Sequence, residues 1–160
     1  MSGPQAASTG TGRELRAVLI PTGSERLLLP NSAVSEVIDY REPQPLEDAP
    51  RWVLGTVLWR QRTFPVISAE RLLDDYFDPT APRLRIALCH SITGSRRFPF
   101  VGLVSRGIPR LVRATAETLE ETVEPPLDPA WPMLAQVYVN DVYALIPDMA
   151  RIERQLETIA

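Results

Sequence analysis

The sequence predicts a mainly β fold, arranged as two small packed barrels or as a sandwich. About ten short apolar or alternating runs follow one another along the 160 residues, with turn residues between them. Sixteen prolines are about twice the usual share, which favours short strands and turns over long helices. Three short segments carry a helical pattern, the last of them at the C-terminus.

The N-terminal part is predicted to contain a tail and three strands. The first twelve residues are weakly polar and lack the basic start and apolar core of a secretory signal, so we expect a disordered tail before a single domain over 13–160. A turn at 21–24 separates the first two strands, and Asn31 or Ser32 is placed to cap one helical turn before the third. The predicted strands are 15–20, 26–29 and 34–40.

Residues 50–73 are predicted to contain a central β-hairpin. Two β-type runs, 52–59 and 63–67, flank a polar turn at 60–62, and a short helix is expected near 70–76. One face of the first strand would hold Val53, Gly55, Val57 and Trp59, and the other Leu54, Thr56 and Leu58. Because both faces are largely apolar, we expect this hairpin to be buried on both sides.

The second half begins after a proline-rich break at 78–82, where we place the boundary between two subdomains. Its predicted strands are 84–90, 98–105, 108–113, 133–139 and 142–146. A short helix over 115–121 would begin at Thr115, and residues 140–141 form a tight-turn pair between the last two strands. A final helix begins at 147–148, with one apolar face made of Met149, Ile152, Leu156 and Ile159.

No group of residues points to catalysis, to a metal or to a cofactor. The only histidine, His90, follows the only cysteine, Cys89, and neighbours on a strand point to opposite faces. Two residues also fall short of the three or four ligands of a metal site. No Gly-rich phosphate loop and no Gly-x-Ser-x-Gly elbow is present. We therefore expect Cys89 and His90 to have structural or surface roles in a protein that is not an enzyme.

The same composition bounds the location of the protein. A single cysteine excludes an internal disulfide and fits a reducing compartment. No apolar run approaches the ~18 residues of a membrane span. We expect a cytoplasmic protein without direct membrane insertion.

The positive charge is concentrated in residues 83–113, which contain seven arginines and no acid. These are Arg83, Arg85, Arg96, Arg97, Arg106, Arg110 and Arg113. They could pair with nearby acids, namely Glu117, Glu120, Glu121 and Glu124, or they could form a basic face for an acidic partner or for nucleic acid. A basic-faced β-barrel that binds RNA or DNA is the alternative function, although the pI of about 5.2 and the lack of interleaved aromatic and basic residues disfavour it.

The central hairpin resembles the characteristic motif of the CheW family, the coupling adaptors of bacterial chemosensory arrays. The matching residues are Gly55, Val57-Leu58-Trp59, Arg60 and Pro65-Val66-Ile67. The chain departs from the family pattern at Trp59, Gln61 and Ser68-Ala69, where Leu, Gly and Asp-Leu are usual. The resemblance implies two packed five-stranded SH3-like β-barrels with short helices and a C-terminal helix.

The resemblance also implies a function and its site. Family members link the regulatory domain of a CheA-type histidine kinase to the cytoplasmic tip of a methyl-accepting chemoreceptor. Val34, Glu36, Gly55 and Arg60 fall on positions that serve receptor and kinase coupling in relatives. With these departures, the chain resembles the extra CheW-like adaptors of type IV pilus-linked systems that govern twitching motility. A scaffold that binds only one of the two partners is the second alternative.

Overall fold

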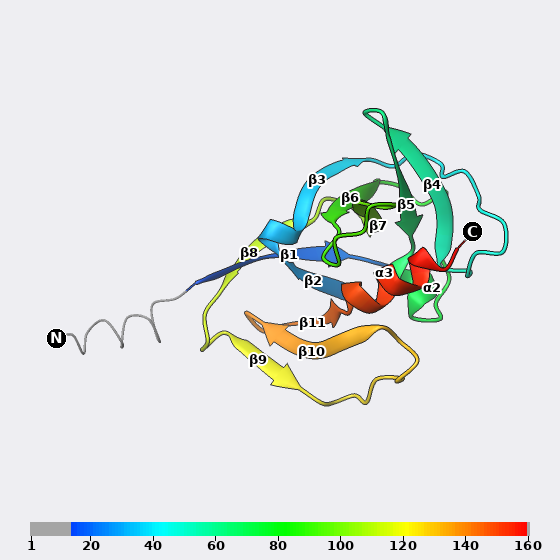
Figure 1. Cartoon of the computed structure of the whole chain (residues 1–160). Helices are drawn as coiled ribbons and strands as arrows, with labels where there is room; N and C mark the ends of the chain where they lie inside the picture. The colour runs from blue at the N-terminus through cyan, green and yellow to red at the C-terminus, as the bar shows by residue number, and fades with distance from the viewer. Residues whose placement is uncertain (1–13, 160) are drawn as a thin grey trace.

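The computed structural model describes residues 14–159, which fold into two curled β-sheets with short helices (Figure 1). The strands are β1 (Leu15–Pro21), β2 (Arg26–Pro30), β3 (Val34–Asp39), β4 (Val53–Trp59), β5 (Arg62–Ile67), β6 (Leu84–His90), β7 (Phe100–Arg106), β8 (Arg110–Ala114), β9 (Leu119–Thr122), β10 (Met133–Val139) and β11 (Val142–Pro147). The helical elements are η1 (Asn31–Ala33), α2 (Ala69–Leu72) and α3 (Met149–Glu157). The predicted tail at 1–12 lies outside the described residues.

The strand order shows how the chain divides between the sheets. One sheet has the order β8-β1-β2-β11-β10-β9, and the other has the order β3-β6-β7-β5-β4. The first two strands therefore join the last four, while the middle of the chain forms the second sheet. The proline-rich segment at 78–82 lies between β5 and β6, which belong to the same sheet. The two sheets consequently do not divide the chain at that segment.

The predicted mainly β architecture is confirmed, but one sheet has six strands where five were expected. The additional strand is β9, which replaces the predicted helix over 115–121. The N–H groups of Thr118 and Leu119 both donate to the carbonyl of Thr115 at 3.0 Å, which makes a single turn. β9 then pairs with β10, with Glu120 opposite Tyr138. Pairing with a distant strand outweighs the local helical preference of this segment.

Buried apolar side chains form three groups that hold the sheets together. The largest group draws residues from both sheets and from α2 and α3. Its helical members confirm the predicted apolar face of the last helix: Met149, Ile152, Leu156 and Ile159 are all buried. The other two groups lie within one sheet each. α3 begins after Asp148, whose carboxylate accepts the main-chain N–H of Arg151 at 3.0 Å.

The central hairpin is buried on one face, so the prediction of burial on both faces was wrong. Val53, Gly55 and Val57 are buried, whereas Leu58 on the opposite face is 65% exposed. β4 is an edge strand of its sheet, and its outer face is only partly covered. Apolar composition alone therefore overstated the burial of this strand.

Two predicted helix ends differ from the structure. Neither Asn31 nor Ser32 caps η1, because the capping position is occupied by Pro30 and no side chain bonds to the turn. α2 ends at Leu72 instead of reaching 76, since Asp74 adopts a left-handed backbone with φ of 58°. The start of α2 is capped by Ser68, whose hydroxyl accepts the N–H of Arg71 at 3.2 Å.

Candidate functional site

Arg60 and Glu36 form an ion pair that joins the two edges of the five-stranded sheet. Arg60 stands in the turn between β4 and β5, and Glu36 lies on β3 at the opposite edge of the strand order. The guanidinium Nη1 is 3.6 Å from the carboxylate Oε2. The same guanidinium lies over the Trp59 ring, 4.3 Å from its centroid. Two of the four motif residues, 36 and 60, are thus brought together at the surface.

The turn that presents Arg60 has a left-handed backbone at both central residues. Arg60 has φ of 47° and Gln61 has φ of 65°, which corresponds to the tight hairpin turn of the primed type. Asn140 and Asp141 adopt the same geometry between β10 and β11, with φ of 49° and 67°, which confirms that predicted turn. Asn and Asp tolerate this conformation better than Gln does. Gln61 therefore holds Arg60 at a conformational cost of about 1 kcal/mol.

The fold itself requires glycine at position 55. Its φ is 142°, and a Cβ atom there would lie 2.1 Å from the carbonyl oxygen of Gln44. Gln44 bridges to Thr56 through two main-chain hydrogen bonds of 2.8 and 2.9 Å. Only glycine lets the loop between β3 and β4 (residues 40–52, the 40s loop) approach β4 this closely. Gly55 therefore keeps this loop packed against the five-stranded sheet.

Val34 lies at the start of β3, next to the shared core. It is partly buried and packs against the core group drawn from both sheets, opposite Cys89 on β6. The strand register shifts between Val34 and Glu36, so a bulge separates the two residues. Val34 is thereby directed to the seam between the sheets, while Glu36 points to the turn that carries Arg60.

A cavity of about 210 Å³ opens beside the Arg60–Glu36 pair. It is lined by Ser35, Glu36, Trp59, Arg60, Arg62, Phe64, Leu88 and Phe100. Most of its lining is aromatic or aliphatic, and the charged side chains that also line it are Glu36, Arg60 and Arg62. No local pattern predicts that Phe100 belongs to this site, because it lies about 40 residues after Arg60 in the chain. The parallel pairing of β7 with β5, which carries Arg62 and Phe64, and its antiparallel pairing with β6, which carries Leu88, bring Phe100 to this place.

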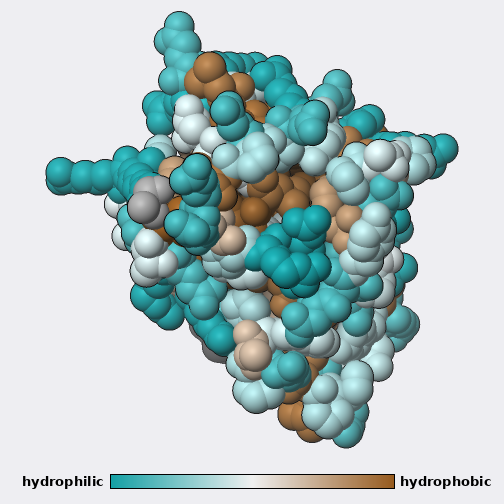
Figure 2. All heavy atoms as spheres, turned by 90° about the vertical axis from the view of Figure 1, so that its right-hand side faces the viewer, coloured by the Kyte–Doolittle hydropathy of each residue, from teal (hydrophilic) through white to brown (hydrophobic). Residues whose placement is uncertain are grey.

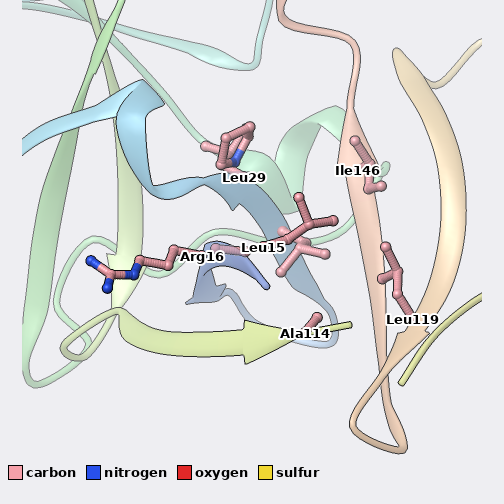
Figure 3. Close-up of a pocket in the computed structure, with 9 residues that line it drawn as sticks. Leu15, Arg16, Leu29, Ala114, Leu119 and Ile146 are labelled. Carbon is pink, nitrogen blue, oxygen red and sulfur yellow. The ribbon is translucent and has the colours of Figure 1, made fainter. Parts of the chain in front are cut away.

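A second cavity, of about 200 Å³, lies in the six-stranded sheet (Figure 3). Its lining is almost wholly apolar: Leu15, Arg16, Ala17, Leu28, Leu29, Pro30, Ala114, Leu119 and Ile146. Leu15, Leu119 and Ile146 gather around it, while the guanidinium of Arg16 points away (Figure 3). Leu15 is 49% exposed, so the cavity is continuous with an apolar part of the surface. No motif in the sequence predicts this site.

The seven arginines of 83–113 are distributed over several elements of the fold. Arg83, Arg85 and Arg106 lie at one end of the β6–β7 pair, and Arg96 and Arg97 lie in the connection at its other end. A strand of seven residues separates these ends by roughly 20 Å. The remaining two, Arg110 and Arg113, belong to β8 in the other sheet.

Two of these arginines pair with acids that the sequence analysis did not consider. Arg85 lies 3.6 Å from Asp39, and Arg106 lies 3.0 Å from the buried Glu70. Within residues 14–159, none of the ion pairs joins an arginine of this segment to the glutamates at 117, 120, 121 or 124. The alternative in which these arginines pair with those glutamates is thus not found among the residues that the structure describes.

Cys89 and His90 do not act together. Cys89 is buried in the core shared by both sheets, and this burial, together with the nearby Glu153 charge, raises the pKa of its thiol to about 12. His90 is exposed and packs against the Phe100 ring at 5.4 Å. The thiol stays protonated near neutral pH and is a poor nucleophile there. Among the described residues, no three His, Cys, Asp or Glu side chains are grouped to hold a metal ion.

The face that carries α2 and α3 shows a hollow of apolar atoms surrounded by hydrophilic side chains (Figure 2). Partly buried apolar residues pack against the shared core from several loops, including Leu46, Trp52, Leu127 and Trp131.

No helix within residues 14–159 is long and apolar enough to cross a membrane.

Comparisons with known proteins agree with this architecture. A family model of the CheW-like domain matches residues 16–157. The fold is similar to the crystal structure of the scaffolding protein TtCheW from Thermoanaerobacter tengcongensis, with a TM-score of 0.69 and 16% sequence identity over 84% of this chain and 89% of that chain. No curated protein matches this chain by sequence. Because the family match covers most of its length, the chain belongs to the CheW-like domain family, the non-enzymatic scaffolds that couple components of chemotaxis signalling.

Proposed function

We propose that this adaptor bridges two specific partners: the regulatory domain of a CheA-type histidine kinase and the cytoplasmic tip of a methyl-accepting chemoreceptor. The observation that carries the proposal is the Arg60–Glu36 pair, which joins two motif residues from opposite edges of one sheet at an exposed cavity. An exposed ion pair of this kind contributes little to stability, so both charges can turn to a partner at little cost to the fold.

The receptor would contact the surface around this pair. Glu36 and Arg60 supply charge, and Val34 on the same strand extends the contact toward the apolar seam. Gly55 acts indirectly, by keeping the 40s loop against β4. A helical hairpin laid across this region would meet apolar groups with charged groups beside them, as helix-in-groove recognition requires.

The kinase would dock on the six-stranded sheet. The apolar cavity bounded by Leu15, Leu119 and Ile146 can receive an apolar side chain from a barrel domain (Figure 3). A transient signalling interface needs only a modest apolar centre with a polar rim. Two separate sheets thus offer two separate surfaces, which is what an adaptor between two proteins needs.

Reconstitution of receptor-dependent kinase control tests this proposal. Arg60→Ala should weaken the response of the kinase to the receptor and leave the melting temperature unchanged, because Arg60 is exposed. Arg154→Ala on the exposed side of α3 is the matched control and should behave as wild type. Unchanged control by Arg60→Ala would remove Arg60 from the site. Binding of one partner alone would identify a single-partner scaffold, and salt-sensitive binding of an oligonucleotide in place of both would reject the proposal.

We also propose that the protein works in the cytoplasm, in a type IV pilus-linked system that controls twitching motility. The departures from the family motif at Trp59, Gln61 and Ser68 support an auxiliary adaptor. Deleting the gene should impair twitching and spare swimming. Loss of swimming with normal twitching would assign the protein to the flagellar pathway.

A further inference from the structure

Arg62 stands at the cavity beside Arg60 without a carboxylate partner. It is the first residue of β5, it is exposed, and its guanidinium lies 5.6 Å from the centroid of the Phe100 ring. The ion pairs among residues 14–159 join Arg60 to Glu36, Arg85 to Asp39 and Arg106 to Glu70, and none of them involves Arg62. The cavity therefore contains two guanidinium groups and a single carboxylate, which leaves one positive charge uncompensated.

The surroundings of Arg62 restrict the chemistry of a ligand. Phe100 is near both Arg62 and His90, with its ring centroid 5.4 Å from that of the imidazole, so the guanidinium lies over an aromatic ring that has a second aromatic neighbour. Phe64 and Leu88 add apolar wall, which lowers the local dielectric and strengthens charge pairing. An acidic side chain suits this site, because its methylene groups can cover the ring while its oxygens accept two N–H groups of the guanidinium.

The neighbouring Glu36 favours a singly charged ligand over a doubly charged one. Its carboxylate lines the same cavity and would repel a phosphate dianion more strongly than a carboxylate. We infer that Arg62, supported by Phe100, binds an aspartate or glutamate side chain of the receptor tip and thereby selects which receptor this adaptor accepts. This inference rests on the proposed function, and it assigns the selecting role to a residue outside the four motif positions.

The test compares charge variants in a binding titration with a purified fragment of the receptor's helical hairpin. Arg62→Glu should weaken binding at least about tenfold, which corresponds to about 1.4 kcal/mol, and Arg62→Lys should lose less because it keeps the charge. Arg154→Glu makes the same change of charge on α3 and should bind within about twofold of wild type. Thermal melting of each variant verifies that the fold is kept, as expected for an exposed residue at the start of β5.

The outcomes separate this inference from the proposed function. If wild type binds the fragment and Arg62→Glu binds equally well, Arg62 is not the selecting residue, while the adaptor function stands. If wild type does not bind the receptor fragment at all, both proposals fail. A reversal completes the test: replacing acidic residues of the hairpin tip by arginine, one at a time, should restore binding to Arg62→Glu at one position. Failure of every replacement would overturn the assignment of a carboxylate ligand.

Discussion

Thr93 and Glu153 are joined by two hydrogen bonds, although 60 residues separate them in the chain. The Thr93 hydroxyl donates to Oε1 of Glu153 at 2.6 Å, and the Thr93 main-chain N–H donates to the same oxygen at 3.2 Å. The Ser91 hydroxyl and the Ile92 N–H donate to this carboxylate as well, at 2.6 and 2.8 Å. One buried side chain of α3 thereby holds the first three residues of the β6–β7 connection.

We expect the Glu153 contact to make stability depend on pH. Burial alone would raise the pKa of this carboxyl, but the hydrogen bonds from Ser91, Thr93 and Ile92 outweigh burial and hold the pKa below its usual value. The contact therefore stabilises the fold above the unfolded pKa of about 4.3, and this contribution is lost as the pH falls through the lower folded pKa. Glu153→Gln should cost about 1–3 kcal/mol at pH 7 and less in acid. Urea denaturation across the acidic range measures this, and an undiminished difference at low pH would contradict it.

Gln61→Gly should keep or raise stability, because glycine adopts the φ of 65° without a Cβ conflict. The expected gain is at most about 1 kcal/mol, since glycine also raises the entropy of the unfolded chain. The same substitution at Gln155, inside α3, serves as the control and should cost about 1 kcal/mol. A clear loss of stability in Gln61→Gly would show that the glutamine is not strained.

Gly55→Ala should destabilise the protein by about 3 kcal/mol or more. Its Cβ would overlap the carbonyl of Gln44 and break the bridge to Thr56. Gly94→Ala is the matched control, because Gly94 also has a positive φ, of 73°, but no atom lies within 4 Å of its added Cβ. Gly94→Ala should lower the free energy of unfolding by only about 1 kcal/mol. Equal melting temperatures for the two variants would show that the close approach is not limiting.

Arg106→Ala should cost about 3–5 kcal/mol, because it leaves the buried Glu70 carboxylate without its cationic partner. Glu70 is fully buried, and its Oε2 accepts the Nε–H of Arg106 at 3.0 Å. Arg85→Ala provides the comparison, since its partner Asp39 is 90% exposed and the pair should contribute less than about 1 kcal/mol. Chemical denaturation of both variants measures the difference. A similar small loss in both would mean that Glu70 finds water or another donor.

The predictions made from sequence succeeded where the signal is local and periodic. The turn at Asn140-Asp141 and the apolar face of α3 were identified because each depends on residues close together in the chain. The helix predicted over 115–121 failed, because β10 supplies a pairing edge that no local pattern reveals. The burial of Leu58 was overstated for a similar reason: an edge position in a sheet cannot be read from composition.

The prolines, turn residues and short apolar runs are enough to predict short strands, and the motif around Arg60 predicts a hairpin turn in a chain that resembles an adaptor. The partners of Arg60, in contrast, depend on strands that lie far apart in the chain. Glu36 reaches Arg60 because the sheet curls until its two edge strands approach, and Phe100 reaches Arg62 through the parallel pairing of β5 with β7. The physical reason is that a local pattern specifies which faces are apolar, whereas the contacts between distant strands follow from the packing of the whole chain.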